Sequence, residues 1–372
     1  LAREVAREGI VLLKNEGVLP LKKNIGSIAV IGPNADMMYN QLGDYTAPQE
    51  REEIVTVLDG IRKAVSPSTK VNYVKGCAIR DVTTSNIPAA VEAARAADAV
   101  VLVVGGSSAR DFKTKYIGTG AADVSNDGNQ LLSDMDCGEG YDRSTLRLLG
   151  DQEKLLEAVA ATGKPLVVIY IQGRTLNMNL ASEKAQALLT AWYPGEQGGT
   201  AIADVLFGDY NPAGRLPVSV PRSEGQLPLF YSQGKQRAYV EEEGTPLYAF
   251  GYGLSYTKFD YSQLELQKGN GKDVLQTVSC TVTNTGDCDG EEVVQLYICD
   301  KVASVSQSPI LLKAFERISL KKGESKKVTF TLGEEELSLY NMEMKQVVEP
   351  GDFKVMVGAA SDDIRLEGEF TL

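Results

Sequence analysis

The sequence contains no histidine. This absence excludes Ser-His-Asp and Cys-His catalytic groups, and it excludes the common zinc hydrolase sites, because each of these depends on an imidazole. Acid–base chemistry would fall to carboxylates, lysine, tyrosine or arginine. The sequence also lacks an apolar run of 18 or more residues, so it predicts no membrane-spanning helix and no membrane partner.

Basic residues are fewer than acidic ones, with 38 Lys and Arg against 50 Asp and Glu, which gives a net charge of -12. Nucleic acids and anionic membranes bind basic patches, so this balance disfavours both as partners. The five cysteines are scattered and form no CxxC pair, which predicts neither a zinc site nor a disulfide framework. A bridge between Cys280 and Cys299 is conceivable, but free thiols are favoured. We predict no cofactor and no metal.

The chain begins at Leu1, with a helical pattern over residues 1–19 and no capping residue before it. We therefore expect a trimmed piece of a longer protein. No signal peptide is present, and this absence leaves the cellular location unknown.

A length of 372 residues fits two or more domains. Residues 27–221 alternate short apolar runs with amphipathic stretches, which predicts a largely parallel sheet covered by helices on both faces. The predicted strands are residues 28–32, 71–74, 99–104, 165–171, 187–191 and a weaker 216–220. The predicted helices are residues 55–65, 87–97, 152–161 and 198–206.

From about Phe259 the apolar residues recur with a period of two, and turns rich in Gly and Asp separate them. This pattern predicts a β-sandwich of the immunoglobulin or fibronectin type. Four strands are expected, around residues 277–283, 294–298, 328–332 and 353–357. The resulting domain prediction is an α/β domain over residues 1–222, a linker over 223–258 and a β-sandwich over 259–372.

The connection between the strand ending at Val104 and the helix beginning near Gln152 is unusually long and has almost no periodicity. Loops of this size in compact domains are usually active-site or binding loops. Open α/β sheets also place ligands at the carboxyl ends of their strands, where this loop begins. Glu139 lies in it between two glycines, which let the backbone present a side chain. A surface insertion is the alternative interpretation, with Glu139 as a solvated residue.

A metal site is a further alternative for the same loop. Asp123, Ser125, Asp127, Gly128 and Asp134 have an EF-hand-like spacing. The flanks are not helical, however, and the last position has Asp where a long bidentate Glu is required. The spacing therefore only weakly indicates calcium.

Two other motifs follow predicted strands. Residues 32–36 (Gly-Pro-Asn-Ala-Asp) lack the GxGxxG spacing of a dinucleotide site and predict a tight strand–helix turn. Residues 192–199 (Trp-Tyr-Pro-Gly-Glu-Gln-Gly-Gly) offer aromatics that could stack on a sugar, although core packing before a glycine-rich helix start is favoured.

Taken together, these segments resemble the family 3 glycoside hydrolases. The matching segments are residues 6–15, 19–21, 28–35, 139–143, 150–152, 192–199, 204–208, 211–217 and 250–257, in the order of the family and over essentially the whole chain. The resemblance implies a six-stranded α/β sandwich followed by a fibronectin-III-like domain. It also implies that a TIM-like barrel normally precedes them and contributes an aspartate nucleophile.

By the same resemblance, Glu139 matches the family's acid/base glutamate. The implied function is the C-terminal portion of a retaining, exo-acting β-glycosidase, with β-glucosides as the first expectation and β-xylosides as the second. Its partners would be a β-linked oligosaccharide or glycoside and the missing barrel, and its location periplasmic or secreted. Such an acid must keep its proton near neutral pH. Asp134 and Asp136 are candidate anionic neighbours that would favour this, and we expect Arg143 to pair with Asp142.

A chain without the nucleophile should be inactive alone. Two other interpretations remain open at this point. One is a carbohydrate-binding or structural module without a catalytic role. The other is a nucleotide-binding α/β protein, which the missing glycine loop disfavours.

Overall fold

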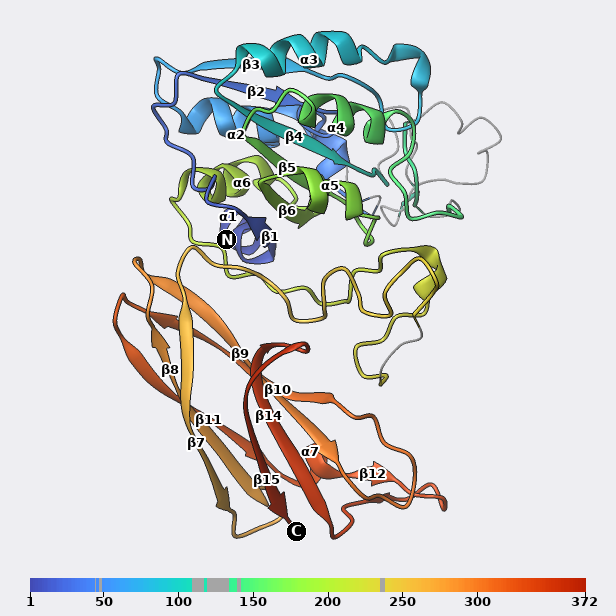
Figure 1. The fold of residues 1–372 in the computed structure, drawn as a ribbon, viewed down its shortest axis with the longest axis vertical. Coiled ribbons are helices and arrows are strands. Elements are labelled where there is room, and N and C mark those ends of the chain that lie inside the picture. Colours follow the sequence, from blue (N-terminus) through green and yellow to red (C-terminus); the bar gives the residue numbers. More distant parts are fainter. Residues whose placement is uncertain (44, 47–48, 109–116, 119–133, 139–141, 235–237) are drawn as a thin grey trace. The chain divides into compact units, whose positions relative to one another are not determined.

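The structure is a computed structural model that describes residues 1–43, 45–46, 49–108, 117–118, 134–138, 142–234 and 238–372 (Figure 1). The chain divides into two compact units. The first comprises Leu1–Gly214 and Arg222–Glu224, and the second comprises Arg215–Pro221 and Gly225–Leu372. The domain boundaries at residues 222 and 259 stay a prediction. No helix in the described ranges has the length and apolar character that a membrane span requires.

A six-stranded sheet forms the centre of the first unit, in the order β1-β6-β5-β4-β2-β3. Its strands are β1 (Val11–Asn15), β2 (Ser27–Ile31), β3 (Lys70–Val74), β4 (Ala99–Gly105), β5 (Leu166–Ile171) and β6 (Ala187–Trp192). β1 pairs antiparallel with β6, and every other pair is parallel. The four strands at the centre of this order are almost wholly buried, which is why they read as continuous apolar runs.

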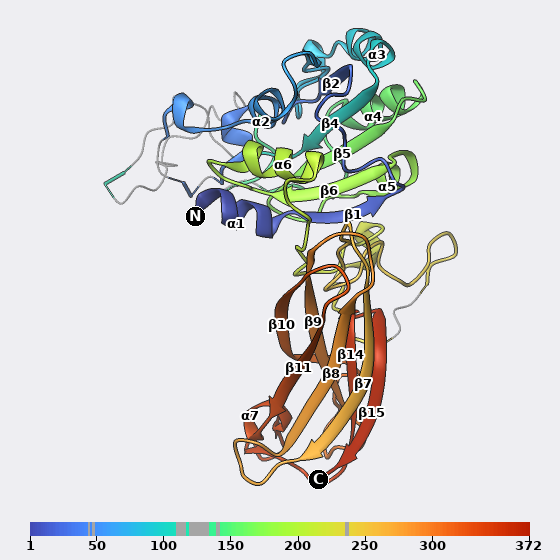
Figure 2. The same cartoon turned by 90° about the vertical axis from the view of Figure 1, so that its left-hand side faces the viewer.

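Helices cover both faces of this sheet, which confirms the predicted fold class. Its helices are α1 (Ala2–Gly9), α2 (Val57–Ala64), α3 (Ile87–Ala96), α4 (Gln152–Ala160), α5 (Asn179–Lys184) and α6 (Gly198–Phe207), with short 3₁₀ turns at Met38–Gln41, Arg51–Glu53 and Val82–Thr84. Figure 2 shows α1, α2 and α6 on one face and α3, α4 and α5 on the other. α6 approaches α2 closely because Gly199 has no side chain: a Cβ there would lie 1.8 Å from the Thr56 carbonyl oxygen.

Two predictions at the ends of the α/β pattern are wrong. The helix expected over residues 1–19 ends at Gly9, and the chain continues as strand β1. The reason is burial, since Ile10 through Leu13 are at most 1% exposed and β1 extends the sheet beside β6. The weak strand expected at residues 216–220 is also absent, and only an isolated bridge joins Val220 to Tyr248.

The second unit contains two antiparallel sheets, in the orders β10-β9-β14-β15 and β11-β8-β7. Its elements are β7 (Phe259–Lys268), β8 (Gln276–Asn284), β9 (Gly290–Asp300), β10 (Leu311–Leu320), β11 (Ser325–Leu332), α7 (Glu334–Leu337), β12 (Leu339–Tyr340), β13 (Gln346–Val347), β14 (Asp352–Ala360) and β15 (Asp363–Thr371). Alternate residues of both sheets form one apolar core, as a sandwich requires. The four predicted strands are β8, β9, β11 and β14.

Residues 215–221 and the residues around Gly251 lie outside the strands but belong to the second unit. Hydrogen bonds and an ion pair hold them there. Leu216 and Tyr252 are joined through their backbones at 2.9 Å, and Arg215 forms a buried ion pair with Glu292 of β9 at 2.6 Å. Gln295 of β9 donates to the Gly251 carbonyl oxygen at 3.1 Å. The stretch around Gly251, which the sequence predicted to be linker, is therefore held to β9 through side-chain contacts.

Candidate functional site

The long loop leaves the sheet at the carboxyl end of β4, its buried central strand. Gly105 has a φ of 140°, and a Cβ there would lie 1.9 Å from the Ile171 carbonyl oxygen on β5, so only glycine fits. Gln152, at the start of α4, accepts from the Gly105 nitrogen at 2.9 Å and donates to its carbonyl oxygen at 3.0 Å. One fully buried amide therefore ties the beginning of the loop to the helix that follows it.

Two distant parts of the loop lie against each other just beyond this point. The Asp136 nitrogen donates to the Ser107 carbonyl oxygen at 2.8 Å. In return, the Ser107 nitrogen donates to Asp136 Oδ1 at 2.7 Å. Residues 107 and 136 are thereby fixed side by side, although a long stretch of sequence separates them.

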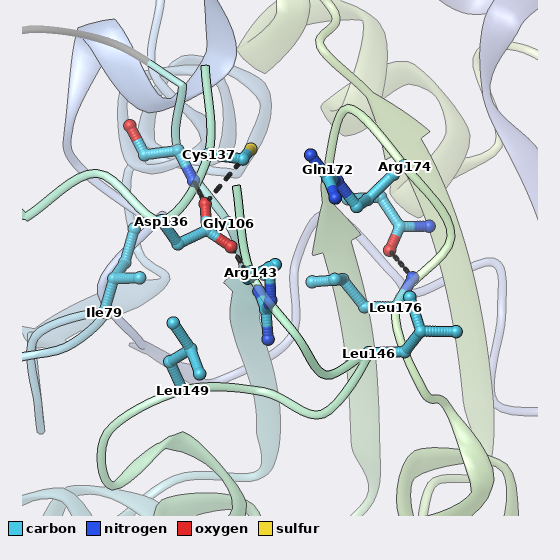
Figure 3. A network of polar contacts seen from close by, with 12 residues as sticks. Ile79, Gly106, Asp136, Cys137, Arg143, Leu146, Leu149, Gln172, Arg174 and Leu176 are labelled. Carbon is cyan, nitrogen blue, oxygen red and sulfur yellow. Dashed lines mark hydrogen bonds and ion pairs between the residues drawn. The ribbon is translucent and has the colours of Figure 1, made fainter. Parts of the chain in front are cut away.

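Asp136 and Arg143 form a buried ion pair at the centre of this arrangement (Figure 3). Their side chains are 1% and 4% exposed, respectively. Arg143 Nη1 donates to Asp136 Oδ2, Nε donates to the Thr145 carbonyl oxygen at 2.7 Å, and Nη2 donates to the Arg147 carbonyl oxygen. One guanidinium thus connects residue 136 to residues 145 and 147.

The neighbouring carboxylates are also engaged within the fold. Asp134 accepts from the backbone nitrogens of Ile79 at 2.7 Å and Arg80 at 2.8 Å. Asp142 accepts from the backbone nitrogen of Arg143 at 2.8 Å and from Arg174 Nη1 at 2.6 Å. These two hydrogen bonds lower the pKa of the Asp142 carboxyl.

The expected side-chain pair between Arg143 and Asp142 is therefore wrong. The Arg143 guanidinium binds Asp136, and the partner of Asp142 is Arg174, which follows β5. Burial explains the choice, because the buried Asp136 carboxylate needs a cation more than the exposed Asp142 does. Asp136 was a candidate anionic neighbour of Glu139, and the structure shows that its charge is compensated by Arg143.

Tyr193 contacts Cys137, the residue that follows Asp136. Its hydroxyl is 3.7 Å from Cys137 Sγ, and a Cβ on Gly173 would lie 2.4 Å from its ring. Burial raises the pKa of both the Tyr193 hydroxyl and the Cys137 thiol. Trp192 and Tyr193 are both half-buried, so the core interpretation of their motif stays a prediction. The five cysteines, Cys280 and Cys299 included, are free thiols.

Glu139 itself lies outside the described residues, as do Gly140 and Tyr141. The structure describes the residues on either side, Gly138 and Asp142. Of the EF-hand-like positions, only Asp134 is described, and its carboxylate accepts from the backbone nitrogens of Ile79, Arg80 and Asp81. No cluster of three or more Cys, Asp or Glu with metal-ligand geometry occurs in the ranges that the structure describes.

Reasoning from the sequence missed the roles of Gln152, Arg174 and the Asp136–Arg143 pair. A signal for Gln152 was present, because it stands at the first residue of α4 in a segment already singled out. The partner of Arg143 carried no local signal, since adjacent residues of opposite charge do not reveal which of them is buried.

The fold and site together define the class of protein: an α/β sandwich with a long loop at the carboxyl end of a central parallel strand, combined with a fibronectin-type β-sandwich. The glycosyl hydrolase family 3 C-terminal domain matches residues 10–256, and the fibronectin type III-like domain matches residues 292–361. The chain belongs to glycosyl hydrolase family 3.

Two curated relatives show how much of a family member is present. A β-xylosidase of Formosa agariphila is 43% identical over 98% of this chain and 49% of its own length. A periplasmic β-glucosidase of Salmonella typhimurium is 40% identical over 100% of this chain and 49% of its own length. The chain therefore spans about half the length of the curated relatives that it matches.

A comparison with a solved structure also shows that the chain spans about half of its relative. The β-glucosidase of Listeria innocua, solved in complex with glucose, is 31% identical with a TM-score of 0.84. The match covers 99% of this chain and 49% of the Listeria chain. The similarity extends over both units and again over about half of the relative.

Proposed function

We propose that this chain is the part of a retaining, exo-acting β-glycosidase that supplies its general acid/base, Glu139. The nucleophilic aspartate would lie in an N-terminal barrel outside residues 1–372, and the chain alone would be inactive. The observation that carries the proposal is the loop at the end of β4. Its described residues on both sides of Glu139 are held by buried polar contacts, and the chain spans about half of relatives that are β-glucosidases and β-xylosidases.

The chemistry requires two carboxyl groups on opposite sides of the scissile bond, about 5–5.5 Å apart in a retaining enzyme. In the first step, Glu139 would donate its proton to the leaving oxygen while the nucleophile attacks the anomeric carbon. In the second step, the Glu139 carboxylate would take a proton from water, which then releases the sugar from the nucleophile. No metal or cofactor enters this scheme.

We further propose β-glucosides as the primary substrates and β-xylosides as the secondary ones, released from the non-reducing ends of β-linked oligosaccharides. A periplasmic or secreted location is proposed by similarity to the Salmonella protein. The ratio of kcat/KM on matched aryl β-glucosides and β-xylosides would decide between the sugars, and a ratio in favour of xylosides would reverse their order.

Substitution Glu139→Gln in the complete enzyme tests the role of this residue. On a β-linked disaccharide, whose leaving group needs a proton, we expect kcat/KM to fall by roughly 10²–10⁴-fold, the usual contribution of general acid–base catalysis. On an activated aryl glycoside, kcat/KM should fall much less. Its kcat should still fall, because the second step lacks its base, and azide should restore turnover by replacing water.

The matched control is Asp209→Asn, which changes an exposed carboxylate that binds Lys23 outside the loop. It should leave the dependence on leaving group unchanged. Wild-type activity of Glu139→Gln on the disaccharide would contradict the assignment, and it would favour a non-catalytic carbohydrate-binding or structural module.

A further inference from the structure

Asp136 and Arg143 lie on either side of residues 137–142, the stretch that contains Glu139. They are joined to each other, and each has a second anchor: Asp136 accepts from the Ser107 nitrogen at 2.7 Å, and Arg143 donates to the Thr145 carbonyl oxygen at 2.7 Å. Both ends of the stretch are thus tied together and to the chain that leaves β4.

From this geometry we propose that Asp136 and Arg143 are positioning residues for the acid/base. The pair joins two residues that flank this stretch, and we expect this link to position the Glu139 carboxyl for proton transfer. This inference rests on the proposed function of Glu139 and adds to it two residues that touch neither the sugar nor the reacting atoms.

Burial is the first argument for a positioning role. An ion pair taken out of water loses hydration, and apolar residues of similar volume often stabilise a protein as well or better. A pair this deeply buried instead fixes the relative positions of the groups that it binds, because the N–H donors of a planar guanidinium have fixed directions. The three Arg143 contacts go to residues 136, 145 and 147, so one side chain sets the spacing of three points on the loop.

The charges give a second argument. A general acid must hold its proton, and a free guanidinium beside it would favour the ionised form. Arg143 instead has Nε, Nη1 and Nη2 engaged, and its charge is matched by Asp136. The charge of Arg143 is thus matched within the pair, which is compatible with a nearby acid that must keep its proton.

Proton transfer is sensitive to such placement. The acid must come within hydrogen-bond reach of the leaving oxygen, about 2.6–3.2 Å. A misplacement of 1 Å by a mutation away from the reacting atoms can cost about 10²-fold in rate. Loosening the pair should therefore weaken acid catalysis without removing the acid.

The test uses two variants of the complete enzyme. Asp136→Asn removes the negative charge but keeps an acceptor for the Ser107 nitrogen, and Arg143→Lys keeps the positive charge but loses the planar set of guanidinium donors. The matched control is Asp204→Asn. Asp204 is also buried, with a side chain 4% exposed, and it binds Arg3 at 2.7 Å in a pair that joins α6 to α1. Each variant is assayed for kcat and KM on a β-linked disaccharide and on a dinitrophenyl glycoside, and its thermal unfolding midpoint is measured.

For both pair variants we expect kcat/KM on the disaccharide to fall by roughly 10–10²-fold, with little change in its KM. On the dinitrophenyl glycoside the loss of kcat/KM should be much smaller, and kcat and KM should fall together, because a misplaced base also slows the second step. Asp204→Asn should lower the unfolding midpoint and affect both substrates equally. If Asp136→Asn does not fold, Arg143→Lys decides the question alone.

Equal losses on both substrates in the pair variants, as in the control, would overturn the positioning role. Glu139→Gln, assayed in parallel, separates this result from a failure of the proposed function. If Glu139→Gln depends on the leaving group and the pair variants do not, only the positioning inference is wrong. If Glu139→Gln itself shows no such dependence, the proposed function fails.

Discussion

Two buried ion pairs, one in each unit, use the same kinds of charge in different surroundings. Asp136 and Arg143 bond to backbone groups of an irregular loop, whereas Arg215 bonds to Glu292 within a regular strand of the sandwich. Glu292 also accepts from the neighbouring Val293 nitrogen at 2.7 Å. Similar burial therefore does not imply a similar role, because the two pairs hold different kinds of chain.

The difference shows where chemistry can be placed in this fold. In the second unit, the ordered strands already fix the backbone, and the Arg215 pair attaches a further segment to them. In the first unit, the described residues of the loop between β4 and α4 contain no strand or helix, and hydrogen bonds from side chains fix their backbone instead. Catalytic groups tend to lie on loops held by a rigid scaffold, and the Asp136–Arg143 pair extends that scaffold into the loop.

The largest effect on stability is expected at the second pair. Arg215→Met leaves Glu292 buried without its cation, which should lower the free energy of unfolding by about 3–5 kcal/mol. The double variant Arg215→Met/Glu292→Leu should recover most of this loss, because no unpaired charge remains. Urea unfolding of the chain, followed by circular dichroism, measures both.

In the complete enzyme, Arg215→Met should show no dependence on the leaving group, in contrast to Asp136→Asn. If Arg215→Met lowered kcat/KM on the disaccharide but not on the dinitrophenyl glycoside, the two pairs would no longer differ in their effect on acid catalysis. An unchanged unfolding midpoint would show that Arg215 does not anchor its segment.

A smaller effect is expected at Glu224, which supports the same loop from outside. It accepts from Thr145 Oγ1 at 2.6 Å and from the Leu146 nitrogen, and these hydrogen bonds lower the pKa of its carboxyl. A lowered folded-state pKa means that Glu224 stabilises the fold above its unfolded pKa, about 4.3, and that this contribution is lost as the pH falls through the folded value.

Glu224→Gln should therefore destabilise the chain slightly at neutral pH, by less than about 1 kcal/mol because the side chain is exposed. The difference from the wild type should shrink as the pH falls below about 4.3, and it should disappear once the pH lies below the lowered folded-state pKa of Glu224. Unfolding midpoints measured at neutral and acid pH give the comparison, and a difference that grows as the pH falls would have the wrong sign.

Much of the fold could be predicted from the sequence because burial leaves periodic patterns. The central strands of the first unit are buried on both faces and read as apolar runs, and β8, β9, β11 and β14 alternate as half-buried strands do. β7 escaped notice because it contains a bulge between Ser262 and Glu265, with Gln263 at a φ of 54°. The extra residue changes which positions face inward, so no single alternation runs through the strand.

Two of the errors have a common cause, since partners distant in sequence decided the outcome. Residues 10–13 became strand because β6 was available beside them. The Arg143 guanidinium binds the buried Asp136, and its exposed neighbour Asp142 binds Arg174. At the candidate site, the sequence indicated the loop and Glu139, but the hydrogen bonds that hold the loop depend on burial and carry no pattern of their own.

Trapping the covalent intermediate tests the central claim, that the nucleophile of this glycosidase lies outside the chain that supplies its acid/base. The complete enzyme is treated with a 2-deoxy-2-fluoro glycoside that carries a good leaving group, and the labelled peptide is identified by mass spectrometry. We expect the sugar on an aspartate outside residues 1–372, and no label on the isolated chain. A sugar attached to a peptide within residues 1–372 would contradict the account.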